Sequence, residues 1–447
     1  MALSENPEQK AGEAVTVRSP SRLALAMRSL RHRNFRLFFG GQLISLIGTW
    51  MQNIAQAWLV YRLTGSSLLL GTVGFASQIP VFLLAPIGGM VADRHNRHRV
   101  VIGTQTASMV LALILAALTL GGVVQVWQIM VLAALLGVVN AFDIPARQAF
   151  IVEMVGREDL MNAIALNSSM FNGARIIGPA IAGILVASIG EGWCFFANGV
   201  SYIAVIVGLL LMHVEFVRRS RESSPLEHII EGFRFVRRTL PIRDLLLLLG
   251  LVSLVGMPYS VLMPIFADKI LHSGARGLGI LMGATGVGAL IGALMLAAKS
   301  GIRGLGSWVG VSTAAFGVTL IVFSWSRVFW ISALMLVPVG MAMMVEMASS
   351  NTLIQAMVPD ELRGRVMAVY SMMFMGMAPL GALFAGVLAD RLGSPLTVSI
   401  GAVACLAGAA VFWRRLPALR VEARQLIIAQ AAAGGEPAEQ ATARSIS

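Results

Sequence analysis

Two ionisable side chains lie deep inside apolar stretches that are long enough to cross a membrane. Arg175 stands near the middle of a stretch over about residues 163–188, and Glu346 lies in one over about 328–350. An unpaired charge at the centre of a bilayer costs ~2.5 kcal/mol or more, so such a side chain faces a cavity or an opposite charge. A carboxyl group in that setting can carry a proton. Glu346 and Arg175 are therefore candidates for proton coupling or substrate binding.

Asp143 is a further candidate for proton coupling or for pairing with Arg175. It lies near the end of the stretch over about residues 126–148, with Arg147 four residues later. Side chains four residues apart meet on one face of a helix. A local ion pair between Asp143 and Arg147 is therefore an equally good interpretation, and the sequence leaves both open.

The composition requires a membrane protein. Hydrophobic residues make up 57% of the 447 residues and charged residues 13%, against about 45–50% and about 25% in soluble domains. A net charge of +12 is found in nucleic-acid-binding proteins, but the basic cytoplasmic loops of a membrane protein produce it equally well. No nucleic-acid partner is therefore expected. The two cysteines, Cys194 and Cys405, have no metal-ligand spacing, and no catalytic cluster or metal site is expected. A Walker-type phosphate loop is absent, which argues against ATP hydrolysis.

Apolar runs of membrane length divide the chain into two halves of six spans each. We expect a cytoplasmic tail over 1–34, a first bundle over 35–216, a linker over 217–243, a second bundle over 244–413 and a disordered cytoplasmic tail over 414–447. The expected spans are 35–61, 66–92, 100–121, 126–148, 163–188, 194–216, 244–267, 277–298, 308–325, 328–350, 366–389 and 395–413. The linker has helical amphipathic spacing, which fits a helix in the membrane interface or one packed on the protein.

The distribution of basic residues sets the expected orientation. With both termini cytoplasmic, the inner segments carry 26 of the 34 Lys and Arg residues and the outer loops carry five. Cytoplasmic loops are enriched in Lys and Arg. This predicts a multi-pass protein in a lipid bilayer with both termini cytoplasmic, and the family resemblance described below implies a bacterial-type inner (plasma) membrane.

The loop after the second expected span, residues 88–99, has a specific order of glycine, aspartate and basic residues. It reads Gly-Gly-Met-Val-Ala-Asp-Arg-His-Asn-Arg-His-Arg, and in this order it resembles the major facilitator superfamily. The resemblance implies an all-α fold of twelve transmembrane helices in two pseudo-symmetric bundles, and an inner gate built from this loop. The residues given that gating role are Gly89, Asp93, Arg94, Arg97 and Arg99. A glycine-ended helix followed by positive-inside charges would explain the arginines alone.

Residues 140–183 narrow the resemblance to the twelve-span drug, macrolide and siderophore exporters. The fifth expected span contains Gly178, Pro179 and Gly183, similar to the exporter motif in which glycines and a proline bend the helix and seal it against leak. This chain has Ala174 where that motif has a glycine, so the motif is incomplete.

The first expected span contains amide side chains among apolar residues. Gln52, Asn53 and Gln56 lie within one helical step of four residues, and they can line a substrate path. Hydrogen bonds between helices are an equally good explanation.

These observations predict a secondary active transporter rather than an enzyme. The resemblance implies proton-coupled efflux of amphipathic small molecules by alternating access, in a chain that works as a monomer without a cofactor. The alternatives left open are sodium coupling, uptake, transport of lysolipid or another organic anion, a non-transporting membrane receptor, and a membrane enzyme.

Overall fold

The chain is helical throughout the part that the structure describes. The structure is a computed structural model that describes residues 27–156, 158–212, 225–299 and 301–433, and these ranges contain no strand. Eleven helices in these ranges are long and apolar enough to cross a membrane, so the chain is a multi-pass membrane protein. The expected all-α class is confirmed.

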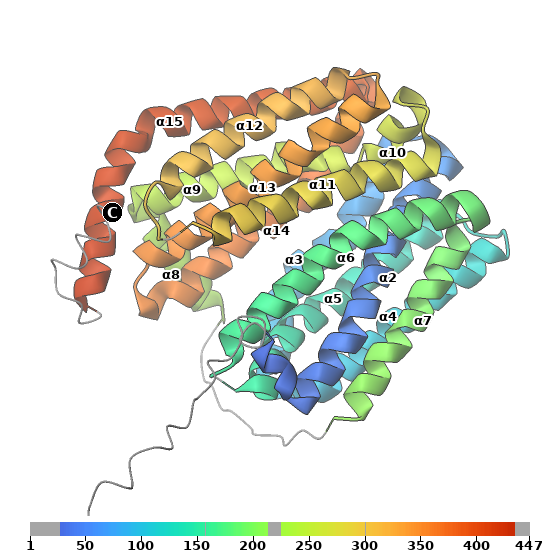
Figure 1. The fold of residues 1–447 in the computed structure, drawn as a ribbon, viewed down its shortest axis with the longest axis horizontal. Coiled ribbons are helices and arrows are strands. Elements are labelled where there is room, and N and C mark those ends of the chain that lie inside the picture. Colours follow the sequence, from blue (N-terminus) through green and yellow to red (C-terminus); the bar gives the residue numbers. More distant parts are fainter. Residues whose placement is uncertain (1–26, 157, 213–224, 300, 434–447) are drawn as a thin grey trace, which may run out of the picture.

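The long helices form two groups (Figure 1), and one amphipathic helix lies between these groups in the sequence. The first group comprises α2 (Arg33–Thr64), α3 (Ser67–Arg94), α4 (Arg97–Leu120), α5 (Val126–Val155), α6 (Leu160–Ile189) and α7 (Glu191–Leu210), preceded by the short turn η1 (Arg28–Arg31). The second comprises α9 (Leu240–Leu251), α11 (Gly274–Ala297), α12 (Leu305–Trp325), α13 (Phe329–Met357), α14 (Asp360–Leu392) and α15 (Ser394–Ala433). The helix between the groups is α8 (Pro225–Arg238).

One expected span is less apolar than the others, and another is irregular. Helix α2 has 32 residues but is not among the eleven, because its amide side chains lower its hydropathy. Helix α9 continues to Ile270 through η2 (Val252–Gly256), η3 (Met257–Ser260), α10 (Met263–Ile265) and η4 (Phe266–Ile270). Pro258 and Pro264 lie in this stretch, and proline interrupts a regular helix because it lacks an amide proton.

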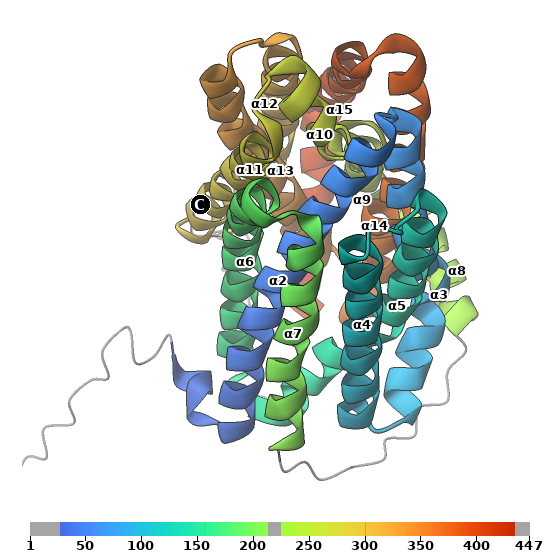
Figure 2. The same ribbon diagram turned by 90° about the vertical axis from the view of Figure 1, so that its right-hand side faces the viewer.

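Each group packs mainly within itself. Helices α3 and α5, α2 and α7, and α4 and α7 pack together in the first group; α11, α12 and α13 pack together in the second, as do α12 and α15. Figure 2 shows α2, α4, α6 and α7 running in roughly one direction. We call the end where α2 begins, α3 ends and α9 begins the arginine-rich end. The other end, where α2 ends and α3 begins, is the opposite end.

The two groups meet along two pairs of helices, α3 with α14 and α6 with α11. A Cβ atom added to Gly71 of α3 would lie 2.9 Å from the Cα atom of Gly386 in α14. A Cβ atom added to Gly183 of α6 would lie 3.1 Å from the Cα atom of Gly279 in α11. Helix backbones approach this closely where the residues are small. All four glycines lie toward the opposite end, so helix backbones of the two groups approach closely there.

The last helix is longer than the sequence indicated. Helix α15 continues through Ala433, so the expected disorder of residues 414–447 is wrong for residues 414–433; residues 434–447 lie outside the described part. Leu416 and Leu419 are buried against the second group, and Leu426 packs at the edge of the same cluster. These apolar contacts stabilise the helix beyond the expected span.

Helix α8 packs on α14. A Cβ atom added to Gly232 would lie 2.6 Å from the carbonyl oxygen of Arg365, so glycine permits the close approach. Glu231 forms an ion pair with Arg365 at 2.5 Å, and Val236 is buried. Ile230 remains exposed. The linker residues 213–224 and the tail residues 1–26 lie outside the described part.

Candidate functional site

Glu346 is buried in the second group with little to stabilise a negative charge. Its side chain comes from the middle of α13 and is 2% exposed. The hydroxyl group of Ser350, one turn later, lies 3.5 Å from Glu346 Oε1, which is at the outer limit of a hydrogen bond. Among the described residues no Lys, Arg or His lies within ion-pair distance of Glu346. Its ionised form therefore has no compensating charge close by.

Asp143 is equally buried but fully hydrogen-bonded. The hydroxyl of Thr104 donates to Oδ1 at 2.8 Å, and the amide of Gln105 donates to the same oxygen at 2.9 Å. Arg147 Nε donates to Oδ2 at 3.0 Å. The carboxylate links α4 to α5, and Arg147 supplies the opposite charge. This is the local pairing that the spacing of Asp143 and Arg147 allowed.

Arg175 lies on α6 where that helix meets α11. A Cβ atom added to Gly286 of α11 would lie 3.1 Å from the carbonyl oxygen of Arg175. The Nη2 atom of Arg175 is buried and has no hydrogen-bond partner in the described part of the chain. Neither Asp143 nor Glu346 forms an ion pair with it, so the structure does not bring together the pair that the sequence offered. Tyr259 of the second group lies close enough for an electrostatic interaction. A guanidinium group is thus held at the junction of the two groups, with no carboxylate in ion-pair contact among residues 27–156, 158–212, 225–299 and 301–433.

The loop after α3 is held entirely by contacts within the first group. Arg97 Nη2 bonds Asp93 at 3.1 Å, Arg97 Nη1 bonds Glu153 of α5 at 2.9 Å, and Nε donates to the carbonyl of Ala92 at 3.0 Å. Arg94 and Arg99 are exposed. In the described residues these contacts do not reach the second group.

Gly88 and Gly89, in the last two turns of α3, have different surroundings. A Cβ atom added to Gly88 would lie 1.9 Å from the carbonyl oxygen of Ala141 in α5. The same addition at Gly89 would meet nothing within 4 Å. Gly88 therefore allows close packing inside the first group, whereas Gly89 faces open space.

The Gly-Pro segment of α6 packs against two helices, α2 and α11. A Cβ atom added to Gly178 would lie 2.5 Å from the Cβ atom of Trp50, so this glycine lets α6 approach α2. Gly183 faces α11, and the carbonyl oxygen of Pro179 lies 2.6 Å from the position of a Cβ atom on Gly279. The segment therefore packs against both groups.

The three amide residues of α2 do not share one environment. Gln52 is buried and accepts a hydrogen bond from Asn198 of α7 at 2.7 Å, which is a contact between helices. Asn53 is exposed and Gln56 is partly buried. These two residues are the ones that remain able to line a path.

A set of polar contacts at the opposite end joins the groups, and its residues are not among those that the sequence predicts for the site. The Tyr61 hydroxyl donates to Asp268 Oδ2 at 2.7 Å. Lys269 Nζ donates to the carbonyl oxygen of Gly65 at 3.2 Å and lies 5.8 Å from the centroid of the Tyr61 ring. The available signal was an acidic residue directly after the apolar run over 244–267. An acidic residue at the end of a span usually faces water, so the sequence does not predict that Asp268 pairs with Tyr61.

The whole of this arrangement falls within one known family. A family model described as transmembrane secretion effector matches residues 24–435.

Curated relatives that match most of this chain are transporters. The staphyloferrin A transporter of Staphylococcus aureus is 26% identical over 382 residues, covering 85% of this chain and 95% of the relative. The multidrug efflux pump Tap of Mycolicibacterium fortuitum is 27% identical over 359 residues, covering 77% and 87%. Macrolide efflux protein A of Streptococcus pyogenes is 23% identical over 373 residues, covering 81% and 92%. None of these names describes an enzyme.

Solved structures share the fold. The nucleoside transporter NupG matches with a TM-score of 0.67 at 13% identity, covering 87% of this chain and 99% of that one. A bacterial homologue of the human lysosomal transporter Spinster matches with a TM-score of 0.62 at 15% identity, covering 92% and 98%.

Proposed function

Because this chain belongs to the transmembrane secretion effector family of major facilitator superfamily transporters, we propose that it exports amphipathic small molecules in exchange for protons, by alternating access. The relatives named above are a siderophore transporter and efflux proteins for drugs and macrolides. Substrates of those classes are the first to test. Energy would come from the proton gradient, and the chain would work as a monomer.

The observation that carries this proposal is the contrast between the two buried acids. Asp143 accepts three hydrogen bonds, one of them from a cation, and so holds its charge in a fixed place. Glu346 has a single distant hydroxyl as its neighbour. Burying an unpaired charge costs several kcal/mol. On our proposal, Glu346 takes up a proton when its surroundings close and releases it when they open to water, which couples proton movement to the conformational cycle.

Arg175 is proposed to bind the substrate. Its buried, unpartnered Nη2 atom lies at the junction of the groups, which is where an alternating-access transporter binds its cargo. A guanidinium group binds carboxylate and phosphate groups through paired hydrogen bonds. We propose that an acidic group of the substrate occupies this position, with Asn53 and Gln56 as further contacts along α2.

The contacts between the groups support alternating access. Tyr61, Asp268 and Lys269 tie the opposite end together, while the contacts of the Asp93 loop stay within the first group. We propose that this arrangement is the state open toward the arginine-rich end. In the alternate state the open surface at Gly89 would receive the second group, with Asp93, Arg94, Arg97 and Arg99 as the inner gate.

The full topology belongs to the same proposal. Helix α2 would be the twelfth membrane span, so that α2–α7 form one six-helix bundle and the helices from α9 to α15 form the other. The arginine-rich end would face the cytoplasm, together with both termini, because basic residues are enriched on that side of a membrane. The Gly178, Pro179 and Gly183 segment would bend α6 and seal the contact with α11.

The test measures proton movement in inside-out membrane vesicles. Vesicles with an imposed pH gradient are challenged with dyes, macrolides, siderophores and lysolipids, and the gradient is followed by a pH-sensitive dye. We expect a substrate-triggered proton release with the wild type and none with Glu346→Gln, at matched protein abundance. Glu422→Gln removes an acid outside the expected spans and should behave as wild type. Coupling that survives in Glu346→Gln would exclude this residue as the proton carrier.

A second candidate function is transport of an organic anion or lysolipid without efflux of drugs. Arg175 is the one observation that favours it, since its buried Nη2 atom has no hydrogen-bond partner among the described residues and a guanidinium group inside the membrane suits an anionic substrate. Direct flux of a labelled siderophore and of labelled lysolipid in vesicles of both orientations gives the direction. Anion flux in the wild type that is lost in Arg175→Gln, with no drug flux in the wild type, would favour this second function; drug flux in the wild type would exclude it.

A further inference from the structure

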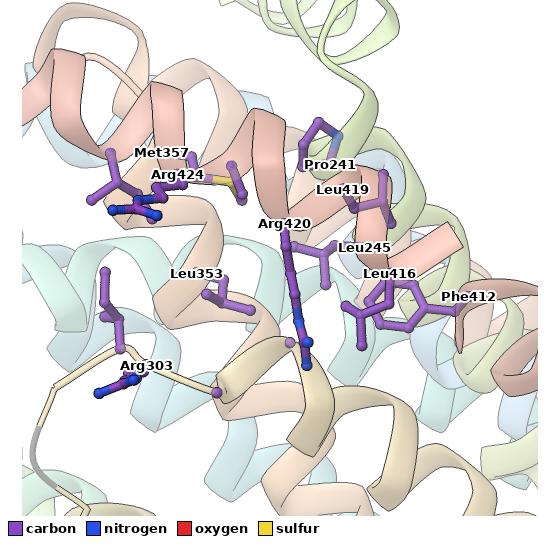
Figure 3. A pocket seen from close by; sticks show the side chains of 15 residues that line it. Pro241, Leu245, Arg303, Leu353, Met357, Phe412, Leu416, Leu419, Arg420 and Arg424 are labelled. Atoms are coloured by element: carbon purple, nitrogen blue, oxygen red, sulfur yellow. The ribbon is translucent and has the colours of Figure 1, made fainter. Parts of the chain in front are cut away.

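A pocket lies at the arginine-rich end of the second group, away from Arg175 and Glu346 (Figure 3). It has a volume of about 430 Å³, within the range of small-molecule sites. Its floor is apolar and is made by residues that are each less than 10% exposed. The floor residues are Leu245 of α9, Leu353 and Met357 of α13, and Phe412, Leu416 and Leu419 of α15.

Three arginines stand around the pocket in Figure 3. Arg303 comes from the segment before α12, and Arg420 and Arg424 come from α15. Arg420 and Arg424 are four residues apart, so they share one face of the helix. Arg420 Nη2 also donates to the hydroxyl of Ser307, which fixes its direction. The residues lining the pocket include no acidic side chain.

The part of α15 that closes the pocket is amphipathic. Beyond Trp413 it carries four arginines and one acid, Glu422, which forms no ion pair in the described part of the chain. Its apolar residues pack on the second group. Pro417 lies in this helix, and in Figure 1 the last part of α15 turns from the direction of the other helices and runs across their ends. A helix of this kind at the end of the spans lies at the level of lipid headgroups.

We propose that this pocket binds an anionic phospholipid from the leaflet at the arginine-rich end. Guanidinium groups bind phosphate oxygens in pairs, and basic pockets at the ends of transmembrane helices suit anionic headgroups. The apolar floor receives the glycerol backbone and the beginning of an acyl chain. A soluble anion has no apolar part that would fill this floor. The ring of positive charge, without a lining acid, excludes cationic amphiphiles. The lipid would tie the end of α15 to α9 and α13.

The experiment uses the purified full-length chain in a neutral maltoside detergent. Phosphatidylglycerol and phosphatidylcholine with the same acyl chains are titrated, and bound lipid is counted by native mass spectrometry. We expect the dissociation constant for phosphatidylglycerol to be about tenfold lower or more, as expected for several basic contacts. Arg424→Gln should reduce this preference several-fold. Arg414→Gln removes the same charge from the same helix outside the pocket, and the preference should persist.

A second variant tests the pocket rather than its charge. Ala423 lines the pocket, and Ala423→Phe fills the space while every arginine is kept. We expect it to lose the high-affinity phosphatidylglycerol adduct, with helical content unchanged by circular dichroism. Equal binding of the two lipids, an equal loss in Arg414→Gln and Arg424→Gln, or full binding by Ala423→Phe would each overturn the proposal. Displacement of the lipid by inorganic phosphate or glycerol phosphate at similar concentrations would also overturn it, because the site would then bind a free anion.

Discussion

The hydrogen bond from Tyr61 to Asp268 should control the balance between the two conformations of the transporter. It joins the first group to the second at 2.7 Å, and Tyr61 is only 6% exposed. Tyr61→Phe removes the hydroxyl and keeps the ring that packs in the core and contacts Lys269. The change therefore isolates one hydrogen bond between the groups.

The magnitude follows from the type of bond. A hydrogen bond to a charged group contributes about 1.5–3 kcal/mol. Opening of this end would let water hydrate the Asp268 carboxylate, so the lower part of that range applies. A change of 1.4 kcal/mol is a factor of ten in an equilibrium constant. We expect Tyr61→Phe to shift the population about tenfold toward the state that is open at this end.

The assay is a distance measurement between spin labels at this end. Val123, between α4 and α5, and Val328, before α13, are exposed and belong to different groups, and both native cysteines are buried. Double electron–electron resonance in lipid nanodiscs should show a longer-distance population that grows in Tyr61→Phe. Tyr202→Phe is the matched control, since the Tyr202 hydroxyl contacts Thr49 within the first group. An unchanged distance distribution in Tyr61→Phe, or the same shift in Tyr202→Phe, would refute the reasoning.

Three further predictions follow from the contacts at the arginine-rich end. Gly88→Val should lower the melting temperature of the protein by several degrees, since an added Cβ atom meets the Ala141 carbonyl oxygen, whereas Gly89→Ala should leave it unchanged in the same thermal assay. Arg97→Gln should make the α3–α4 loop exchange amide hydrogens faster, because both Asp93 and Glu153 lose their partner, and Arg99→Gln should not. The hydrogen bond from His32, aided by Arg28 and Arg31, lowers the pKa of Asp159; this contribution to stability is present above the ordinary pKa of about 3.9 and is lost as pH falls through the lowered value. Asp159→Asn should therefore speed hydrogen exchange in η1 at neutral pH and abolish its acid dependence.

The sequence predicted the helical elements well because their signal is local. Apolar runs and polar loops locate membrane helices directly, and most helix ends in the structure lie within about two turns of the expected ones. The exception is α15. Its segment beyond Trp413 is rich in Ala, Gly, Glu and Gln, a composition typical of disorder, although Leu416, Leu419 and Ala423 recur at helical spacing. That periodicity was the better signal, because an apolar strip that packs on a bundle outweighs composition.

The candidate site was predictable only as a set of residue types. Sequence position places Arg175, Asp143 and Glu346 in the membrane, but it does not say which side chains face each other. Asp143 pairs with Arg147, which is a local contact, and with Thr104 and Gln105 of another helix. The position of Arg175 near Tyr259 and the bond between Tyr61 and Asp268 depend on how the two groups pack, which no local pattern encodes.

The two buried acids have surroundings that suit them to different tasks. Asp143 and Glu346 lie at a similar depth along α5 and α13. One carboxylate is held by an arginine and two neutral donors, while the other has a single distant hydroxyl. An acid that keeps the same partner in both conformations stays ionised throughout the transport cycle, because its surroundings do not change. It therefore cannot carry a proton across. An acid without a partner responds to every change in hydration around it. If Glu346 carries the proton, an arginine placed four residues later, as in the first half, should abolish coupling. Ser350→Arg supplies that partner, and coupling that persists in this variant would place the proton elsewhere.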